Sequence, residues 1–409
     1  MCSTEREEEH DDESFWVLKP IHPSGVRGTA GCETWSVAFS PDGSHFAWSM
    51  GYGMVKVFDW PLPTDEGECI SRCSSKTLKC EHLIWSLAFG PRLSNGAREM
   101  GQVSSRADKE RLLLATGLDN GSIKVWIVST GKLLYELRGH ESIVRDLAFA
   151  PNGSLTLVSA SRDKTLRVWD LNKKGKEPHV LVGPTHWIFK CSISPNSSMI
   201  ASVCNSDSRV YLWSLRSFTF IRYLTYNQPR TMISCDFSAD GALLAVGSYD
   251  CSSWVVDLWD PYTAEHVASL RDCDMCGYRF ENLIRALSFS QEGLRLALVT
   301  DQRALQIWDL ERDQLFQQYT QRGIDALCCT FHPKGGTIAA GTRDGHVKFW
   351  KIPRSVPSLR HLCRFALRFS LSTQQVEVLP LPKKILDFLT YRDVLRHKVL
   401  RCNKGCSSP

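Results

Sequence analysis

Residues 139–170 read GHESIVRDLAFAPNGSLTLVSASRDKTLRVWD and decide the fold. The stretch contains three short apolar runs, at 144–149, 155–160 and 166–169, each of the length and composition of a β-strand. Between them lie Pro-Asn-Gly at 151–153 and Arg-Asp-Lys at 162–164, residue types that favour tight turns. The stretch therefore predicts three consecutive antiparallel strands.

The same order of strands returns along the chain. The residue pairs that end the third strand of each unit are Phe58-Asp59, Trp126-Ile127, Trp169-Asp170, Trp213-Ser214, Trp259-Asp260, Trp308-Asp309 and Trp350-Lys351. From position 126 onward the spacings are 43, 44, 46, 49 and 42 residues. A period of about 40–45 residues with a Gly-His start and a Trp-Asp end is typical of four-stranded propeller blades. The longer gap between 58 and 126 indicates one blade with insertions, which gives seven units.

These units resemble WD repeats, and the resemblance covers roughly residues 30–352. The strand-opening motif recurs at 35–43, 85–89, 235–241 and 287–293. The resemblance implies an all-β fold, a seven-bladed WD-repeat β-propeller. It also implies a polar tetrad that stiffens a blade. That tetrad is complete at His140, Ser159, Asp163 and Trp169.

The two ends of the propeller are expected to close on each other. After Trp350 the chain reaches Pro353 within three residues, which leaves no room for a fourth strand in the last blade. An open blade would expose an unpaired edge. The apolar run 15–21 is the first strand-like segment, so we predict that it supplies the missing outer strand. The propeller then spans residues 15–353.

Composition limits the setting in which the chain works. With 43% apolar residues the chain can bury a large core, but no run of about 18 apolar residues suggests a membrane span. The amino terminus lacks the apolar segment of a secretory signal, so the 16 cysteines are expected to be reduced thiols. We expect an intracellular, cytoplasmic protein with possible access to the nucleus and no membrane partner.

Charge is concentrated at the two ends of the chain. Residues 1–14 carry one arginine against seven acidic residues, which predicts a disordered acidic tail. Residues 351–409 carry twelve basic residues against three acidic ones. A nucleic-acid-binding protein would place clustered basic charge on its large domain, so no nucleic acid partner is expected.

Insertions interrupt the repeats without forming a recognisable site. Segments 62–81 and 91–111 are polar and are expected to be loops around the second blade. A third insertion contains Cys273 and Cys276 in a Cys-x-x-Cys spacing. A structural zinc site needs four ligands, and no second pair follows. The two cysteines are therefore interpreted as loop thiols, and no metal or other cofactor is expected.

Catalytic motifs are also missing. Thr130-Gly131-Lys132 lacks the spacing of a phosphate-binding loop, and no Gly-x-Ser-x-Gly motif occurs. His186 and Cys191 both fall inside the repeat pattern. We therefore expect a protein that is not an enzyme.

From Ser358 the apolar period changes from two to 3.6 residues, which predicts helices. The apolar stripe of the first helix consists of Leu359, Leu362, Cys363, Ala366 and Leu367. Arg360, His361, Arg364 and Arg368 occupy its other side. A polar break at 372–375 precedes a second helical pattern with Ile385, Leu386, Leu389, Val394 and Leu395. Periodicity alone allows two interpretations: the helices pack on the propeller, or their apolar face waits for another chain.

This segment resembles a SOCS box, which we place at 354–400, followed by a flexible tail at 401–409. The resemblance implies that Leu359, Cys363 and Leu367, with Leu362 and Ala366 beside them, contact elongin C in the elongin B–elongin C pair. It implies that Leu379, Pro380, Leu381 and Pro382 select the fifth cullin with its RING protein. A propeller followed by a SOCS box is similar to the WD repeat and SOCS box-containing protein family.

The resemblance implies a non-catalytic substrate-recognition subunit of a ubiquitin ligase, which promotes ubiquitination and proteasomal degradation. The alternative is a WD-repeat scaffold whose tail only caps the propeller. The sequence does not name the protein substrate. Candidate substrate-binding residues lie just after the first apolar position of a strand-opening motif or, for Trp187, one position before the motif. Aromatic and arginine side chains are enriched at interface hot spots. These candidates are Trp35, Trp85, Arg145, Trp187, Phe189 and Arg285. The alternative for the tryptophans is burial between blades.

Overall fold

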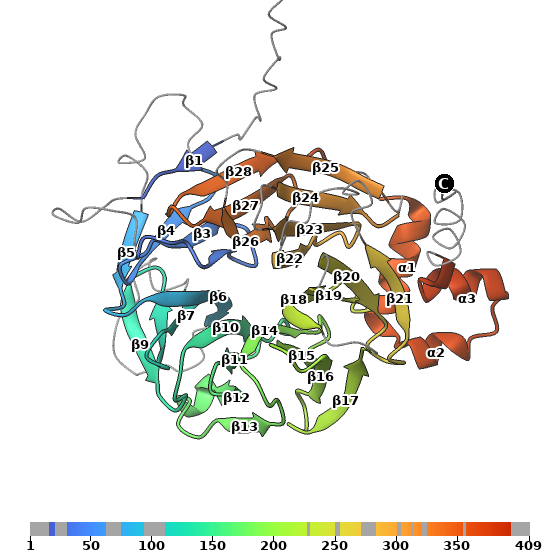
Figure 1. The fold of residues 1–409 in the computed structure, drawn as a ribbon, viewed down its shortest axis with the longest axis horizontal. Coiled ribbons are helices and arrows are strands. Elements are labelled where there is room, and N and C mark those ends of the chain that lie inside the picture. The colour runs from blue at the N-terminus through green and yellow to red at the C-terminus, as the bar shows by residue number, and fades with distance from the viewer. Residues whose placement is uncertain are drawn as a thin grey trace, which may run out of the picture.

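The computed structural model describes residues 16–20, 31–62, 75–93, 111–226, 230–249, 254–270, 284–300, 304–311, 314–320, 325–354 and 357–393. The strands of these residues form seven four-stranded sheets in which hydrogen-bonded neighbours run antiparallel. Figure 1 shows the sheets standing around a common centre, each with one edge strand at the centre and the other edge strand at the rim. The predicted seven-bladed β-propeller is confirmed.

The strands of each blade follow one another from the centre to the rim. The first three blades are β2 (Val37–Phe39), β3 (His45–Ser49), β4 (Met54–Asp59) and β5 (Ser75–Lys79); β6 (Ile84–Leu93), β7 (Arg111–Leu118), β8 (Ile123–Ile127) and β9 (Lys132–Leu137); and β10 (Val144–Phe149), β11 (Thr156–Ser161), β12 (Thr165–Asp170) and β13 (His179–Val182). The next three are β14 (Ile188–Ile193), β15 (Met199–Cys204), β16 (Arg209–Ser214) and β17 (Phe220–Thr225); β18 (Thr231–Phe237), β19 (Leu244–Tyr249), β20 (Trp254–Trp259) and β21 (His266–Leu270); and β22 (Ile284–Phe289), β23 (Arg295–Thr300), β24 (Ala304–Asp309) and β25 (Gln314–Thr320). The last is β26 (Ala326–Phe331), β27 (Thr337–Thr342), β28 (Val347–Lys351) and β1 (Trp16–Leu18).

The seventh blade joins both ends of the propeller. Strand β1 pairs antiparallel with β28, with Leu18 opposite Val347, and Leu18 is almost fully buried. The outer strand predicted from 15–21 is therefore confirmed for residues 16–18. The joint removes an open sheet edge from the ring, as a closed architecture requires.

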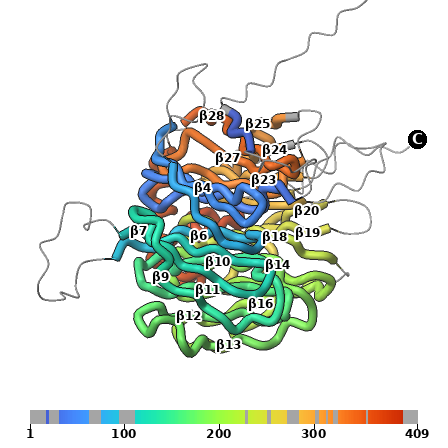
Figure 2. The backbone as a smooth tube through the Cα atoms, turned by 90° about the vertical axis from the view of Figure 1, so that its left-hand side faces the viewer, coloured from blue at the N-terminus to red at the C-terminus, as the bar shows by residue number. Residues whose placement is uncertain are grey.

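The hydrophobic core lies between neighbouring blades. In one cluster Val158 and Val168 of the third blade meet Ile188 and Ile200 of the fourth. Comparable clusters fill every other junction, including the one between the seventh and first blades. Figure 2 shows the ring from its side, with successive blades following one another from β27 and β28 to β12 and β13. Each sheet thus buries both faces against its neighbours.

The polar tetrad of the third blade is formed. The Nδ1–H of His140 donates to Asp163 (2.6 Å), and its Nε2 accepts from the hydroxyl of Ser159 (2.7 Å). The indole N–H of Trp169 donates to the same Ser159 oxygen (2.9 Å). Burial lowers the pKa of His140, so its ring is neutral and can fill both roles. Every buried polar atom in this chain of bonds has a partner.

Two other blades satisfy the equivalent tryptophan of their third strand with a different acceptor. The indole N–H of Trp126 donates to the Thr116 hydroxyl (3.3 Å), and that of Trp259 donates to the Tyr226 hydroxyl (2.9 Å). The architecture therefore tolerates departures from the tetrad because another oxygen can replace the serine.

The predicted loops are partly strands. Strand β5 (Ser75–Lys79) lies inside 62–81, and β6 and β7 reach into 91–111 as far as Leu93 and Arg111. The loop prediction is wrong at these residues. The segments 63–74 and 94–110 lie outside the described residues, as do 1–14, Cys273, Cys276, Val394, Leu395 and 401–409.

Among the described residues, three helices follow the propeller: α1 (Leu359–Ser370), α2 (Thr373–Glu377) and α3 (Lys383–Leu389). They lie at the rim beside β21 and β25 (Figure 1). The hydroxyl of Ser358 caps α1 by accepting from the His361 N–H. The predicted polar break at 372–375 instead begins α2, because Ser372 and Gln375 form a capping box. None of the helices in the described residues is long and apolar enough to cross a membrane.

Candidate functional site

Helix α1 exposes its apolar stripe. The side chains of Leu359, Leu362 and Leu367 are 76%, 49% and 38% exposed. Cys363 and Ala366, which lie between them on the helix, are exposed as well. All five residues predicted to contact elongin therefore lie on the free side of the helix. A contiguous exposed apolar face of this kind is typical of a protein-binding surface.

The polar side of α1 faces the propeller. His361, Arg364 and Arg368 are the residues of this helix that are buried. The Nε2–H of His361 donates to the main-chain oxygen of Glu292 (2.7 Å). Arg368 donates to the Thr373 hydroxyl (2.7 Å). Helix α1 thus packs on the propeller through its polar side. Its apolar side stays exposed, so each of the two interpretations of its periodicity describes one side of the helix.

Further contacts hold the helical segment to the fifth blade. The Thr373 hydroxyl donates to Asp260, and the Tyr391 hydroxyl donates to Asp240 (2.8 Å). Burial, and then the negative charge of Asp240, raises the pKa of Tyr391 well above its ordinary value, so the phenol stays a donor. Arg392 forms an ion pair with Glu265 (2.6 Å). Because these contacts come from α2 and from the turn after α3, and α1 adds its own contact to Glu292, they fix the orientation of the whole segment.

Arginine–aromatic stacking completes the interior of the helical segment. The guanidinium carbon of Arg364 lies 3.8 Å from the ring centroid of Tyr391 and 4.4 Å from that of Phe388. Arg364 also donates to the main-chain oxygen of Phe388 (3.4 Å). Buried cation–π contacts of this kind stabilise by about 2 kcal/mol. The predicted second helix is observed as α3 with Leu389 buried and Ile385 exposed.

The predicted cullin-selecting residues connect α2 to α3. Pro380 and Pro382 are exposed, whereas Leu379 and Leu381 are half-buried. The Leu379 N–H donates to the oxygen of Val376 (3.1 Å), which keeps the connection tight. The segment therefore displays its two prolines at the surface.

A second candidate surface lies where the innermost strands begin. In six blades the register of the first strand shifts by one residue near its start. A bulge of this kind turns one side chain out of the alternation of the strand. The bulged residues are Trp85, Arg145, Phe189, Ile233, Arg285 and Leu327.

Four of the six predicted substrate-binding residues are in direct contact. The rings of Trp35 and Trp85 lie 4.4 Å apart. The guanidinium carbon of Arg145 lies 4.5 Å from the Trp85 centroid and 5.4 Å from the Phe189 centroid. The predicted alternative, tryptophans buried between blades, does not describe these residues, because Trp35 and Trp85 are only partly buried.

Arg162 joins Trp187, another of the predicted residues, to this group. Its guanidinium carbon lies 4.7 Å from the Trp187 ring and 5.4 Å from the Trp85 ring. Trp187 itself is 46% exposed. Arg285 acts through its charge, which contributes to lowering the pKa of Arg145. Sequence reasoning missed Arg162 because only the first strand of each blade was searched for candidates, and Arg162 follows the second strand, β11. The available signal was its position in the turn after β11, which lies near the start of β10.

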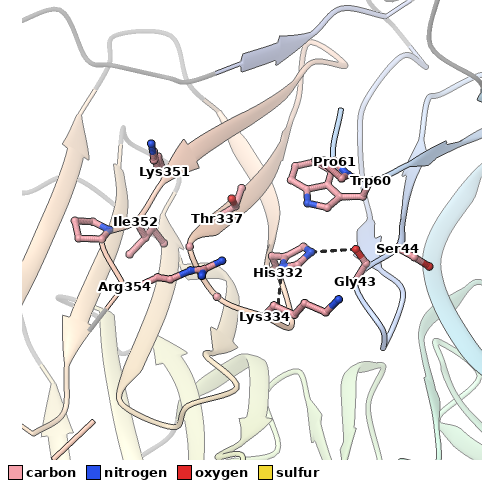
Figure 3. A pocket seen from close by; sticks show the side chains of 13 residues that line it. Gly43, Ser44, Trp60, Pro61, His332, Lys334, Thr337, Lys351, Ile352 and Arg354 are labelled. Carbon is pink, nitrogen blue, oxygen red and sulfur yellow. Dashed lines mark hydrogen bonds between the residues drawn. The ribbon is translucent and has the colours of Figure 1, made fainter. Parts of the chain in front are cut away.

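A cavity of about 610 Å³ opens at the far ends of the first strands, between the first and seventh blades (Figure 3). Its wall includes Trp60, Lys334, Arg354 and His332. Both nitrogens of His332 are engaged: Nε2–H donates to the Gly43 oxygen (3.2 Å) and Nδ1 accepts from the Lys334 N–H (3.1 Å). Burial lowers the pKa of His332. This histidine therefore holds the two blades together and is not available as a catalytic base.

The described part of the chain contains no group of three His, Cys, Asp or Glu side chains arranged to hold a metal ion. Its cysteines are free thiols, and among them Cys363 alone is exposed. Burial raises the pKa of Cys191 and of Cys235 well above the ordinary value. These two thiols act as small apolar side chains of the core.

Comparison with protein families agrees with the fold and with the helical segment. The model of the WD domain, G-beta repeat, matches residues 131–170, 175–214, 222–257 and 316–351. The model of the SOCS box matches residues 355–390, which include all of α1, α2 and α3. Fold and matches together define a WD-repeat propeller that carries a SOCS box.

Whole-chain comparison gives the family. The chain is 41% identical to WD repeat and SOCS box-containing protein 1 of Homo sapiens over 408 residues, covering 92% of this chain and 95% of that protein. It is 41% identical to the Mus musculus protein of the same name and 39% identical to the Danio rerio one, with the same coverage. The chain belongs to the WD repeat and SOCS box-containing protein family.

Proposed function

We propose that this protein is the substrate-recognition subunit of a cullin-type ubiquitin ligase and not itself a catalyst. In this proposal the propeller, residues 15–353, binds the target protein, and the SOCS box, residues 354–400, recruits elongin B, elongin C and the fifth cullin with its RING protein. Holding a target beside a ubiquitin-charged enzyme makes the transfer effectively intramolecular. The target is then ubiquitinated and degraded by the proteasome inside the cell.

The observation that carries the proposal is the inverted polarity of α1. A helix that only capped the propeller would bury its leucines, because burial of an apolar side chain stabilises by about 1.5–3 kcal/mol. Instead Leu359, Leu362 and Leu367 are exposed, while His361 and Arg368 are buried against the chain. This arrangement suits an apolar groove on a partner, and elongin C is the partner that the SOCS box implies.

Elongin capture tests this proposal. Cys363→Arg places a charge in the centre of the exposed apolar stripe and should weaken elongin B–C binding about 100-fold, since an unpaired charge buried in an apolar groove costs several kcal/mol. The measurement is titration of the purified full-length protein with the elongin B–C pair. Melting temperature should stay within about 1 °C of wild type, because the side chain is exposed.

Val182→Arg provides the matched control. Val182 is a 72% exposed aliphatic residue on β13, remote in the fold from the helices, so the same arginine there should leave elongin binding unchanged. If Cys363→Arg bound elongin as tightly as wild type, the proposed docking face would be wrong, and the protein would be a scaffold without ligase recruitment.

Cullin recruitment can be separated from elongin binding. The double variant Pro380→Ala/Leu381→Ala should bind elongin B–C normally but lose capture of the fifth cullin by the assembled complex. The exposed neighbour Val378 (81% exposed) serves as control through Val378→Ala. Equal cullin capture by both variants would remove residues 379–382 from the interface.

A further inference from the structure

The propeller carries a group of stacked arginine and tryptophan side chains, here named the Arg–Trp cluster: Trp35, Trp85, Arg145, Arg162 and Trp187. Its members come from four consecutive blades. The ring of Trp85 is near both guanidinium groups, with its centroid 4.5 Å from the guanidinium carbon of Arg145 and 5.4 Å from that of Arg162. Two positive charges are therefore gathered around one indole ring.

Neither arginine of the cluster has a counter-ion within the described residues. The Nε–H groups of Arg145 and Arg162 are buried and have no hydrogen-bond acceptor there. Asp146, the acid next to Arg145 in the chain, instead binds Lys190 (2.9 Å) and the Cys191 N–H (3.0 Å). A partly desolvated charge without a partner is costly, so an incoming anion would stabilise this arrangement.

The electrostatic environment of Arg145 leads to the same conclusion. Burial, followed by the charges of Arg162 and Arg285, lowers the pKa of Arg145 to about 10, although Asp146 opposes the shift. The guanidinium stays charged at neutral pH but lies in a field of its own sign. A cationic ligand would add to this repulsion, whereas an anionic one would relieve it.

The stacking geometry selects the kind of anion. A guanidinium whose faces lie against aromatic rings offers its N–H groups in its own plane, which matches the two oxygens of a carboxylate. The rings also limit access of water, which strengthens the ion pair. Beside the cluster the half-exposed Trp187 offers a flat apolar contact, the residue type that anchors many protein interfaces.

We propose that the Arg–Trp cluster binds an Asp or Glu side chain of the protein substrate, with Arg145 and Arg162 holding its carboxylate and Trp187 packing on an apolar neighbour. The inference rests on the proposed function only in calling the bound protein a substrate. The recognised feature is an acidic residue next to an apolar one in an accessible segment of the target protein.

Peptide selection on the intact protein tests this inference. A phage-displayed library of random linear peptides is selected on the full-length protein, and in parallel on the double variant Arg145→Gln/Arg162→Gln. Wild type should enrich peptides with Asp or Glu at a shared position beside an apolar residue, and the variant should not. Enrichment of Lys or Arg, or the absence of acidic enrichment, would overturn the inference.

A selected peptide then gives the quantitative test. Replacing its shared acid by Gln should weaken binding at least tenfold, measured by fluorescence anisotropy, and higher salt should weaken it further. Arg145→Lys keeps the positive charge but loses the planar fork of N–H groups, so it should also weaken peptide binding. Its melting temperature shows whether the variant is folded. Arg216→Gln, a change at an exposed arginine of the fourth blade, should have no effect.

Two outcomes would contradict the carboxylate specifically. Equal binding of the Glu and Gln peptides would remove charge recognition, and tenfold tighter binding of a phosphoserine peptide would reassign the cluster to phosphate. Elongin titration of the same preparations separates this inference from the ligase proposal. If the protein failed to bind elongin B–C but still selected acidic peptides, only the ligase proposal would be rejected. If it bound elongin B–C but did not select acidic peptides, only the carboxylate site would be rejected.

Discussion

In the third blade, β11 and β12 turn apolar side chains such as Val158 and Val168 into the core, and the few buried polar groups form a satisfied tetrad. Helix α1 does the opposite: it buries Arg364 and Arg368 and exposes Leu362. The tetrad follows the rule that buried polar groups need partners. Helix α1 follows it only in part, because the Nε–H groups of Arg364 and Arg368 have no acceptor among the described residues. The difference shows that the third blade buries its apolar side chains against its neighbours, whereas α1 presents apolar side chains that no described part of the chain covers.

The largest expected effect concerns the apolar interior of the ring. Deleting residues 1–22 removes β1 and the buried Leu18 side chain, and should lower the free energy of unfolding by roughly 4 kcal/mol. Deleting residues 1–13 leaves β1 in place and should have little effect. Thermal melting of the two truncated proteins compares them directly. Equal melting temperatures would show that the joint at β28 does not stabilise the ring.

The two faces of α1 should respond in opposite ways. Arg364→Ala removes the stacking on Tyr391 and Phe388 and should lower stability of the docked helices by about 2 kcal/mol. Leu362→Asp on the exposed face should leave stability unchanged within about 0.5 kcal/mol. Hydrogen exchange of the α1 amides measures the stability change caused by each of the two substitutions. If Leu362→Asp were the more destabilising change, the assignment of inner and outer faces would be reversed.

A smaller effect is expected where the SOCS box meets the fifth blade. Tyr391→Phe removes the hydroxyl that donates to Asp240 but keeps the ring, so it should cost about 1–2 kcal/mol. Asp240 keeps its bonds from Ser238 and from the Ala242 N–H. Faster hydrogen exchange should therefore appear in α3 and not in the blade. Unchanged exchange in α3 would mean that this contact does not hold the segment in place.

The smallest effect is a pH dependence of the tetrad. Burial holds the pKa of His140 below 6.5, although Asp163 opposes this shift. Below about pH 6.5 the unfolded chain binds a proton that the folded chain resists, so the free energy of unfolding should fall as the pH drops. His140→Gln removes this titration and should give a flatter profile between pH 7 and 5. If the free energy of unfolding of His140→Gln fell more steeply with decreasing pH than that of wild type, a neutral His140 in the folded protein would be contradicted.

Repeats and short motifs made most of the fold predictable. The recurring Trp positions gave the blades, and the missing strand after Trp350 predicted the pairing of 16–18 with β28. The loop prediction failed at β5 because Ser75–Lys79 has one buried side chain, Leu78, and otherwise lacks the alternation of a half-buried strand.

The candidate sites were predictable to a lesser degree. The SOCS box motif placed the docking residues on one helix face, but periodicity does not say which face a helix buries. The buried basic residues of α1 find partners in main-chain oxygens, a hydroxyl and aromatic rings, which only the structure shows. Arg162 was missed because its contact with Trp187 depends on two blades meeting in space. Contacts of that kind follow from tertiary structure and leave no local pattern.

The most direct measurement is the alkylation rate of Cys363, followed by mass spectrometry of the native protein with and without the elongin B–C pair. Cys363 is exposed and should react rapidly in the free protein, while the buried Cys191 should stay unmodified. Adding elongin B–C should protect Cys363. If Cys363 reacted only after denaturation, or if elongin gave no protection, the open docking face on α1 would be contradicted.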